Sequence, residues 1–264
     1  MTAAHPFDAD TEVTPAGDGR FAATLTERWT ALTGAPNGGY VLAVCLRALR
    51  FAMPFPDPVV VSATFMRPAA PGPAEVRTEL LRSGRRVATG EARLVQGDAE
   101  VVRAVASFSD LRLADGPTLI LNRPPALPPP QDAVDPLGGG AIPGITIADR
   151  VEYRTVEKPG WLRGEPTGDP RSELWMRFKE RRDTDLVALA MLVDAVSPAV
   201  MELGASGSAT LQLTVHLRAH PAPGWLACRM ATRHLIDGYH EEDFEIWDSD
   251  GALVAQSRQF ALLR

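Results

Sequence analysis

The sequence predicts an α+β protein made of two copies of one unit, in which a long apolar helix is wrapped by an antiparallel sheet. The first observation is a repeat: the strand-like runs of 59–108 recur at 210–260, with Phe108 aligned on Phe260. The second is that a helical apolar run precedes each repeat. Strands joined by short turns pair in antiparallel fashion and bury one face against a helix.

The first half is expected to begin with two strands within 11–28, joined by the Gly17-Asp18-Gly19 turn. Apolar residues at helical spacing predict a helix over 40–51, which the Asn37-Gly38-Gly39 turn opens. The three prolines of 52–58 end this helix. Four strands should follow, at 58–70, 73–83, 85–96 and 99–110.

Residues 113–144 differ in composition, with eight prolines between Pro117 and Pro143 and three consecutive glycines. Such a segment cannot carry regular structure and is predicted to be a linker. The chain is therefore divided into an N-terminal unit over 1–112, this linker, and a C-terminal unit over 145–264.

The second half repeats the order of the first. A helix is expected over about 184–203, where 186–193 is apolar nearly all round, as in a helix enclosed by a sheet. The predicted strands lie at 145–157 and 171–180 before the helix, and at 209–219, 225–236, 239–248 and 252–263 after it.

Composition excludes several classes of function. The net charge of -6 and the pI near 5.4 argue against a nucleic-acid partner. Cys45 and Cys228 are isolated in apolar runs, so neither a disulfide framework nor a metal site is expected, and no cofactor motif is present. The sequence shows no signal peptide and no apolar run long enough to cross a membrane, so a cytoplasmic location and no membrane partner are predicted.

Asp194 is the strongest candidate for chemistry, because a carboxylate beside a buried apolar helix is costly unless it is paired or functional. Aligning Asn37 on Thr184 places Arg47 on Asp194, so the first half has no carboxylate there and one site per chain is expected.

Two further segments carry polar residues that could belong to a site. In the last strand, Gln259 shares a face with Ser257 and Ala261. The run His240-Glu241-Glu242-Asp243 is predicted to be an exposed turn or strand edge rather than a cation site.

Three stretches together resemble the double-hotdog acyl-CoA thioesterases of the thioesterase II type. They are Gly34-Ala-Pro-Asn37-Gly38-Gly39-Tyr40-Val-Leu-Ala43, Leu189-Ala-Met-Leu-Val-Asp194-Ala195, and the C-terminal run Asp250-Gly251 to Arg264. The resemblance covers the chain apart from the linker. It implies a double hotdog fold, an acyl-CoA substrate and a homo-oligomer.

The resemblance also implies roles for single residues. Asp194 would act as general base or water anchor, while Gln259 and Thr210 orient the attacking water. Thr214 remains an alternative to Thr210. The remaining candidates would bind substrate, with backbone N–H groups facing the thioester oxygen; they are Asn37, Gly38, Gly39 and Tyr40.

Two functions other than hydrolysis are compatible with the predicted fold. The main alternative is a non-catalytic protein that binds acyl groups or acyl-CoA, because fold does not fix function. A hydratase ranks lower, since no histidine lies near Asp194 on the predicted helix.

Overall fold

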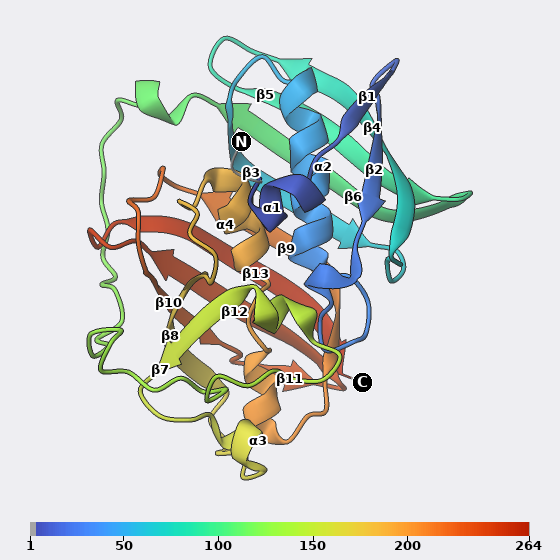
Figure 1. The fold of residues 1–264 in the computed structure, drawn as a ribbon. Coiled ribbons are helices and arrows are strands. Elements are labelled where there is room, and N and C mark those ends of the chain that lie inside the picture. The colour runs from blue at the N-terminus through green and yellow to red at the C-terminus, as the bar shows by residue number, and fades with distance from the viewer. Residues whose placement is uncertain (1–3, 264) are drawn as a thin grey trace.

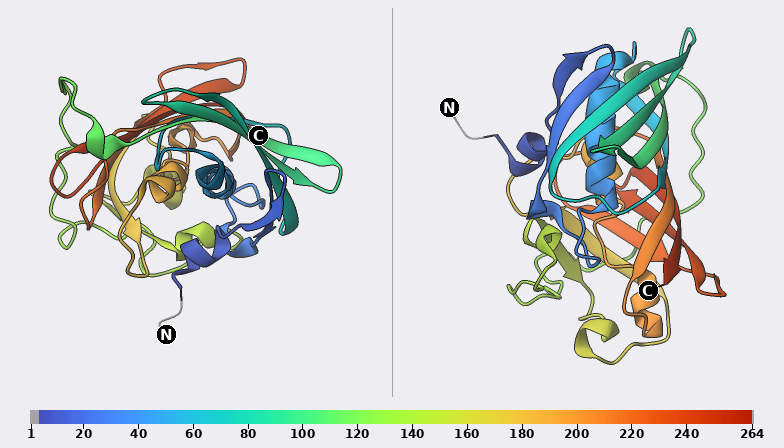
Figure 2. Two further views of the ribbon diagram at one scale, coloured as in Figure 1. Left: turned by 90° about the horizontal axis from the view of Figure 1, so that it is seen from above. Right: turned by 90° about the vertical axis from the view of Figure 1, so that its right-hand side faces the viewer.

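Two buried helices lie side by side inside a strongly curved antiparallel sheet in the computed structural model, which describes residues 4–263 (Figure 1; Figure 2, left). The helices are α2 (Gly38–Ala52) and α4 (Leu186–Leu192). Short helices and 3₁₀ turns complete the helical content: α1 (Pro6–Asp10), α3 (Gly160–Arg163), η1 (Glu27–Trp29), η2 (Leu111–Leu113), η3 (Thr146–Asp149) and η4 (Ala199–Leu203).

The strands of the first half agree with the sequence prediction to within a few residues. They are β1 (Thr14–Gly17), β2 (Arg20–Leu25), β3 (Asp57–Phe65), β4 (Gly72–Ser83), β5 (Ala88–Gln96) and β6 (Ala99–Ser109). The second half contains β7 (Val151–Thr155), β8 (Arg171–Phe178), β9 (Ser208–Leu217), β10 (Leu226–Ala231), β11 (Leu235–Ile236), β12 (Tyr239–Trp247) and β13 (Leu253–Leu263).

The strand order reads the same from both edges of the sheet. From one edge it runs β1-β2-β4-β5-β6-β3, and from the other β7-β8-β10-β12-β13-β9. The two series join where β3 pairs with β9, with Val61 opposite Val215. Each joining strand is the first one after the long helix of its half, so the helices are brought together at this junction.

Helix α2 forms because its sequence is apolar on nearly every side and is capped at its start. The Asn37 side chain accepts a hydrogen bond of 3.0 Å from the backbone N–H of Tyr40. Ten of its 15 residues are buried, since strands β2 to β6 wrap around it. The expected helix over 40–51 is therefore confirmed.

Helix α4 is much shorter than the expected 184–203. It ends at Leu192, and a 3₁₀ turn occupies Ala199–Leu203. Pro198 excludes a continuous α-helix from about 197 onward, and the chain already turns after Leu192, where Asn37 bonds the backbone oxygen of Asp194. Asp194 therefore lies in the turn after the helix, where its N–H donates to Met191 O.

Other departures from the expected elements are local. The 145–157 strand begins as η3 before β7, and 225–236 divides into β10 and β11. The capping residues of the two helices are Asn37 and Asp185, so the sequence alignment on Thr184 was one residue early, and Leu46 rather than Arg47 aligns with Asp194. Phe108 is buried whereas Phe260 is exposed, so that aligned pair was also offset.

The proline-rich segment 113–144 runs along one side of the molecule from β6 to β7 (Figure 1). Leu137 and Ile142 pack against the core, and Val134 makes an isolated bridge with Thr155. The segment is thus tied to the second half near its end. Within residues 4–263, no helix is both long and apolar enough to cross a lipid bilayer.

Candidate active site

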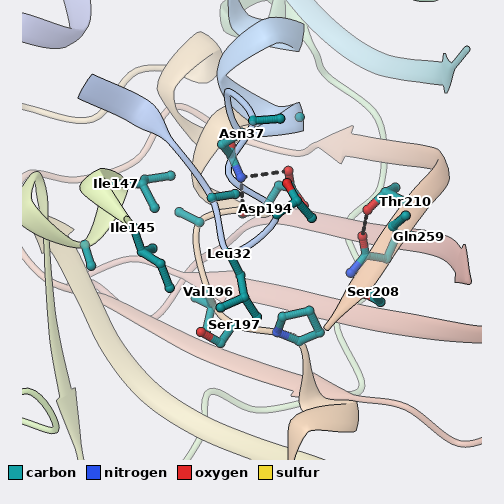
Figure 3. Close-up of a pocket in the computed structure, with 18 of the residues that line it drawn as sticks. Leu32, Asn37, Ile145, Ile147, Asp194, Val196, Ser197, Ser208, Thr210 and Gln259 are labelled. Carbon is teal, nitrogen blue, oxygen red and sulfur yellow. Dashed lines mark hydrogen bonds between the residues drawn. The ribbon is translucent and has the colours of Figure 1, made fainter. Parts of the chain in front are cut away.

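Asp194 is held by the first turn of α2, which comes from the other half of the chain. Its Oδ2 accepts hydrogen bonds from Gly39 N at 2.8 Å and from Asn37 Nδ2 at 3.0 Å. The same Asn37 amide donates to the backbone oxygen of Asp194 at 2.7 Å. The loop before α2 therefore fixes both the backbone and the carboxylate of Asp194 (Figure 3).

The two glycines of α2 are explained by this close approach. A Cβ at Gly39 would lie 2.5 Å from Met191 O and 2.9 Å from Asp194 Cβ. A Cβ at Gly38 would meet the Asp194 carboxylate and the Phe65 ring at 3.0 Å. Only glycine lets the start of α2 contact the end of α4 at this distance.

The environment of Asp194 raises its pKa to about 6. Burial is the largest cause, because it disfavours the charged carboxylate. The hydrogen bonds from Gly39, Asn37 and Gly38 act in the opposite direction, as does the positive end of the helix dipole. A carboxylate with a pKa in this range can take up and release a proton near neutral pH.

A second polar group lies at the start of β9. Thr210 Oγ1 donates to Gln259 Oε1 at 2.8 Å, across to the last strand β13 (Figure 3). Gln259 Nε2 in turn donates to Glu242 Oε1 at 2.8 Å on β12. Three neighbouring strands therefore supply one chain of side-chain hydrogen bonds.

Thr210 and Thr214 lie on opposite faces of β9 because of a bulge. Ala261 pairs with Thr210 while Phe260 pairs with Gln212, so Leu211 is an extra residue. Thr214 instead bonds Ser62 Oγ at 2.9 Å on the junction strand β3. The geometry therefore joins Thr210, rather than Thr214, to Gln259.

Glu242 was missed by sequence reasoning, which treated 240–243 as exposed. Its side chain is only 4% exposed, and its Oε2 accepts from Ala199 N at 2.6 Å. The signal was available in the alternation of β12, where His240, Glu242 and Phe244 share the inner face. Three consecutive acidic residues, 241–243, concealed a pattern that the apolar residues after them continue.

A cavity of about 370 Å³ brings the site together, within the usual size range of small-molecule sites. Asp194, Thr210 and Gln259 all line it. Its other walls are largely apolar and come from both halves and from the proline-rich segment; they include Leu32, Phe65, Leu137, Ile142, Ile145, Ile147, Leu174 and Val196.

The predicted substrate-binding residues divide into two groups. Asn37 and Gly38 line the cavity. Gly39 and Tyr40 do not line it. The Tyr40 side chain is fully buried, stacks on Trp29 at 5.8 Å and donates to Asp10 O at 2.9 Å. Tyr40 is therefore a core residue, and its placement in the substrate site is corrected.

The backbone N–H groups of 38–40 were expected to face a thioester oxygen. Instead, those of Gly38 and Gly39 act on the Asp194 carboxylate, and that of Tyr40 donates to Asn37 Oδ1. The start of α2 thus stabilises the protein's own carboxylate. No group of three or more His, Cys, Asp or Glu side chains among the described residues could hold a metal ion.

Comparison with known proteins agrees with this architecture. The structure superposes on a conserved protein of unknown function with a hot dog fold from Alicyclobacillus acidocaldarius, with a TM-score of 0.85, 23% identity and coverage of 99% of each chain. A Thermobifida fusca protein assigned as a thioesterase II gives a TM-score of 0.88 at 31% identity, covering 98% of this chain and 97% of that one. An uncharacterised Mycobacterium tuberculosis protein is 29% identical, over 92% of this chain and 90% of its own length.

These findings define the molecule as a hotdog-fold protein with a largely apolar cavity beside Asp194. The model of the acyl-CoA thioesterase C-terminal domain matches residues 123–263, and that of the N-terminal domain matches 25–109. The chain therefore belongs to the acyl-CoA thioesterase family, and it is an acyl-CoA thioesterase.

Proposed function

We propose that the chain is a double hotdog that hydrolyses acyl-CoA thioesters with a water molecule held by Asp194, Gln259 and Thr210. The observation that carries this proposal is the placement of these three side chains on one apolar cavity. The matching strand order of the two halves supports the double repeat. The proposed units remain 1–112 and 145–264, with 113–144 between them.

The directions of the hydrogen bonds in the site leave acceptor atoms that can hold an attacking water. Thr210 donates its proton to Gln259 Oε1, so both oxygens keep lone pairs that can accept from water. Asp194 Oδ2 accepts from Gly39 and Asn37, and Oδ1 would accept the other water proton. A water that donates to both sides presents its lone pair to the thioester carbon.

The reaction then needs one proton acceptor and one proton donor. The water oxygen bonds to the carbonyl carbon while Asp194 takes a water proton. The tetrahedral intermediate collapses, the carbon–sulfur bond breaks, and the thiolate leaving group receives that proton from Asp194. The products are a free acid and coenzyme A, and Asp194 returns to its ionised form.

We further propose one site per chain. The position in the first half that corresponds to the Asp194 site is occupied by α1. Arg47 and Arg182 both bind Asp8 and both lie over the buried Phe7 ring. Arg182 also pairs with Asp185, the capping residue of α4. An ion cluster and an aromatic side chain thus fill the space that substrate occupies at Asp194.

The experiment is an assay of free thiol release from a panel of acyl-CoA chain lengths. Asp194→Asn keeps the shape but removes the base, and activity should fall on the order of 10²–10⁴-fold. Gln259→Ala should lose less, because Gln259 orients the water without accepting its proton. Asp250→Asn, in the exposed β12–β13 turn, is the matched control and should behave like the parent.

The alternative of a non-catalytic acyl or acyl-CoA binding protein predicts a different result. The parent would bind acyl-CoA without releasing thiol, and Asp194→Asn would leave that binding unchanged. The homo-oligomer and the cytoplasmic location stay predictions from the sequence.

A further inference from the structure

The hydrogen-bond chain behind the proposed water site ends on a buried carboxyl. Glu242 Oε1 accepts from Gln259 Nε2 at 2.8 Å, and Glu242 Oε2 accepts from Ala199 N at 2.6 Å. Both donors are N–H groups. The side chains of Glu242 and Gln259 are nearly inaccessible to solvent, with exposed fractions of 4% and 7%. No solvent is needed to satisfy either carboxyl oxygen.

The direction of these bonds matters because an amide has two different ends. An ionised carboxylate can only accept hydrogen bonds, so it requires the nitrogen of the Gln259 amide on its side. The amide oxygen must then point to the other side, where Thr210 Oγ1 donates to it at 2.8 Å. Reversing the amide would place two acceptors against each other at Glu242.

We infer that Glu242 is a positioning residue for the proposed hydrolysis: in its ionised form it fixes the Gln259 amide so that the oxygen faces Thr210 and the attacking water. This inference rests on the proposed function. Glu242 is not among the described residues that line the cavity, so it acts through Gln259.

Protonated Glu242 has the opposite effect on the amide. A carboxylic acid carries an O–H donor, which requires the amide oxygen of Gln259 on its side. The amide then turns over and presents its nitrogen to Thr210 and the cavity. Water meets a donor in place of an acceptor, and it is no longer held with its lone pair toward the thioester.

The surroundings allow this change of protonation near neutral pH. Burial, the largest cause, raises the pKa of Glu242 to about 7, against the hydrogen bonds from Ala199 and Gln259. Asp194 and Asp243 raise it further by charge repulsion. Two other ionisable groups lie nearby: His240, on the same inner face of β12 and with its own pKa lowered, and Glu202 on η4, the element that contributes Ala199.

The test is Glu242→Gln, measured as kcat/KM against pH. The substituted amide has one oxygen, and Ala199 N requires it. Its NH₂ group then faces Gln259 and imposes the reversed amide at every pH. At pH about 8 we expect kcat/KM to fall about 10- to 100-fold. The ratio of parent to variant should shrink toward one as the pH falls through about 7.

The matched control is Glu241→Gln, the adjacent residue, which faces the other side of β12 and contacts His234. It should reproduce the parent profile. A Glu242→Gln variant that is folded and has the parent profile overturns the inference. So does a loss of activity that is equal at all pH values, since a merely structural role would give that result.

Gln259→Ala keeps the test usable if Glu242→Gln does not fold. Without the amide, Glu242 has nothing to orient, so the step near pH 7 should vanish from the profile and only the one near 6 should remain. A profile of Gln259→Ala that retains both steps contradicts the inference. Failure of the proposed function is distinct, since it would appear as a parent that does not hydrolyse acyl-CoA or an Asp194→Asn variant that does.

Discussion

The backbone N–H of Gly39 donates a 2.8 Å hydrogen bond to Asp194 Oδ2, which joins the first turn of one buried helix to the residue just beyond the end of the other. The two residues are 155 positions apart in the sequence. The proposed base is therefore held in place by the half of the chain that does not carry it.

Gly39→Ala should damage both stability and activity. The added Cβ would lie 2.5 Å from Met191 O, so α2 and α4 must separate. Overpacking of this kind costs about 1–3 kcal/mol, although alanine is otherwise the better helix former. Thermal unfolding and thiol release check this. Gly116→Ala, where nothing lies within 4 Å of the added Cβ, should leave both unchanged.

Thr210→Val should lower kcat by roughly tenfold or more with little change in fold, because it removes the hydroxyl that bonds Gln259. Thr214→Val is the matched control, since Thr214 lies on the other face of β9 and bonds Ser62 on β3. Steady-state kinetics on both variants decide between the two threonines. A larger loss in Thr214→Val would contradict the assignment of Thr210.

Leu137→Trp should shorten the range of acyl chains that the enzyme accepts. Leu137 belongs to the proline-rich segment and lines the cavity, so a larger side chain there reduces the space for the substrate. We expect kcat/KM to fall for the longest accepted chain and to change little for the shortest. Leu119→Trp, in the same segment and 80% exposed, should keep the parent's preference.

Asp194→Asn should make the protein more stable at high pH. The pKa of Asp194 is raised to about 6, so between pH about 4 and 6 the folded protein keeps a proton that the unfolded chain has released. The parent's free energy of unfolding therefore falls as the pH rises through this range. At pH 8 the variant should gain roughly 1–3 kcal/mol. Urea unfolding at pH 4 and pH 8 measures this, and an equal difference at both would contradict it.

The sequence predicted the fold well because its signals were local. Helix α2 has a capping asparagine and a continuous apolar run, and the strands have period-2 alternation bounded by Gly and Pro. The length of α4 was wrong because apolar residues continue past Leu192, while the chain turns there to let Asn37 reach the Asp194 backbone. That contact joins distant parts of the sequence, and no local pattern contains it.

The residues that line the cavity were predicted in part, for a related reason. The side chains expected to act together, Asp194, Gln259 and Thr210, do line one cavity. Tyr40 was misplaced because helical spacing gives which face is apolar but not which residues reach a cavity formed by two halves. Glu242 was missed because three adjacent acidic residues resemble a solvated turn, and only the register of β12 against β13 buries one of them.

The most direct test of the central claim, that Asp194 activates a water, is a single turnover with enzyme in excess over acyl-CoA in H₂¹⁸O. If Asp194 acts as general base, water attacks the thioester itself and the released acid contains one ¹⁸O atom. If Asp194 instead attacks as a nucleophile and water opens the resulting anhydride at the Asp194 carboxyl carbon, the bond from that carbon to the bridging oxygen breaks and the acid leaves with an oxygen of Asp194. Release of unlabelled acid together with ¹⁸O in the Asp194 carboxyl group, found by peptide mass spectrometry, would contradict the account.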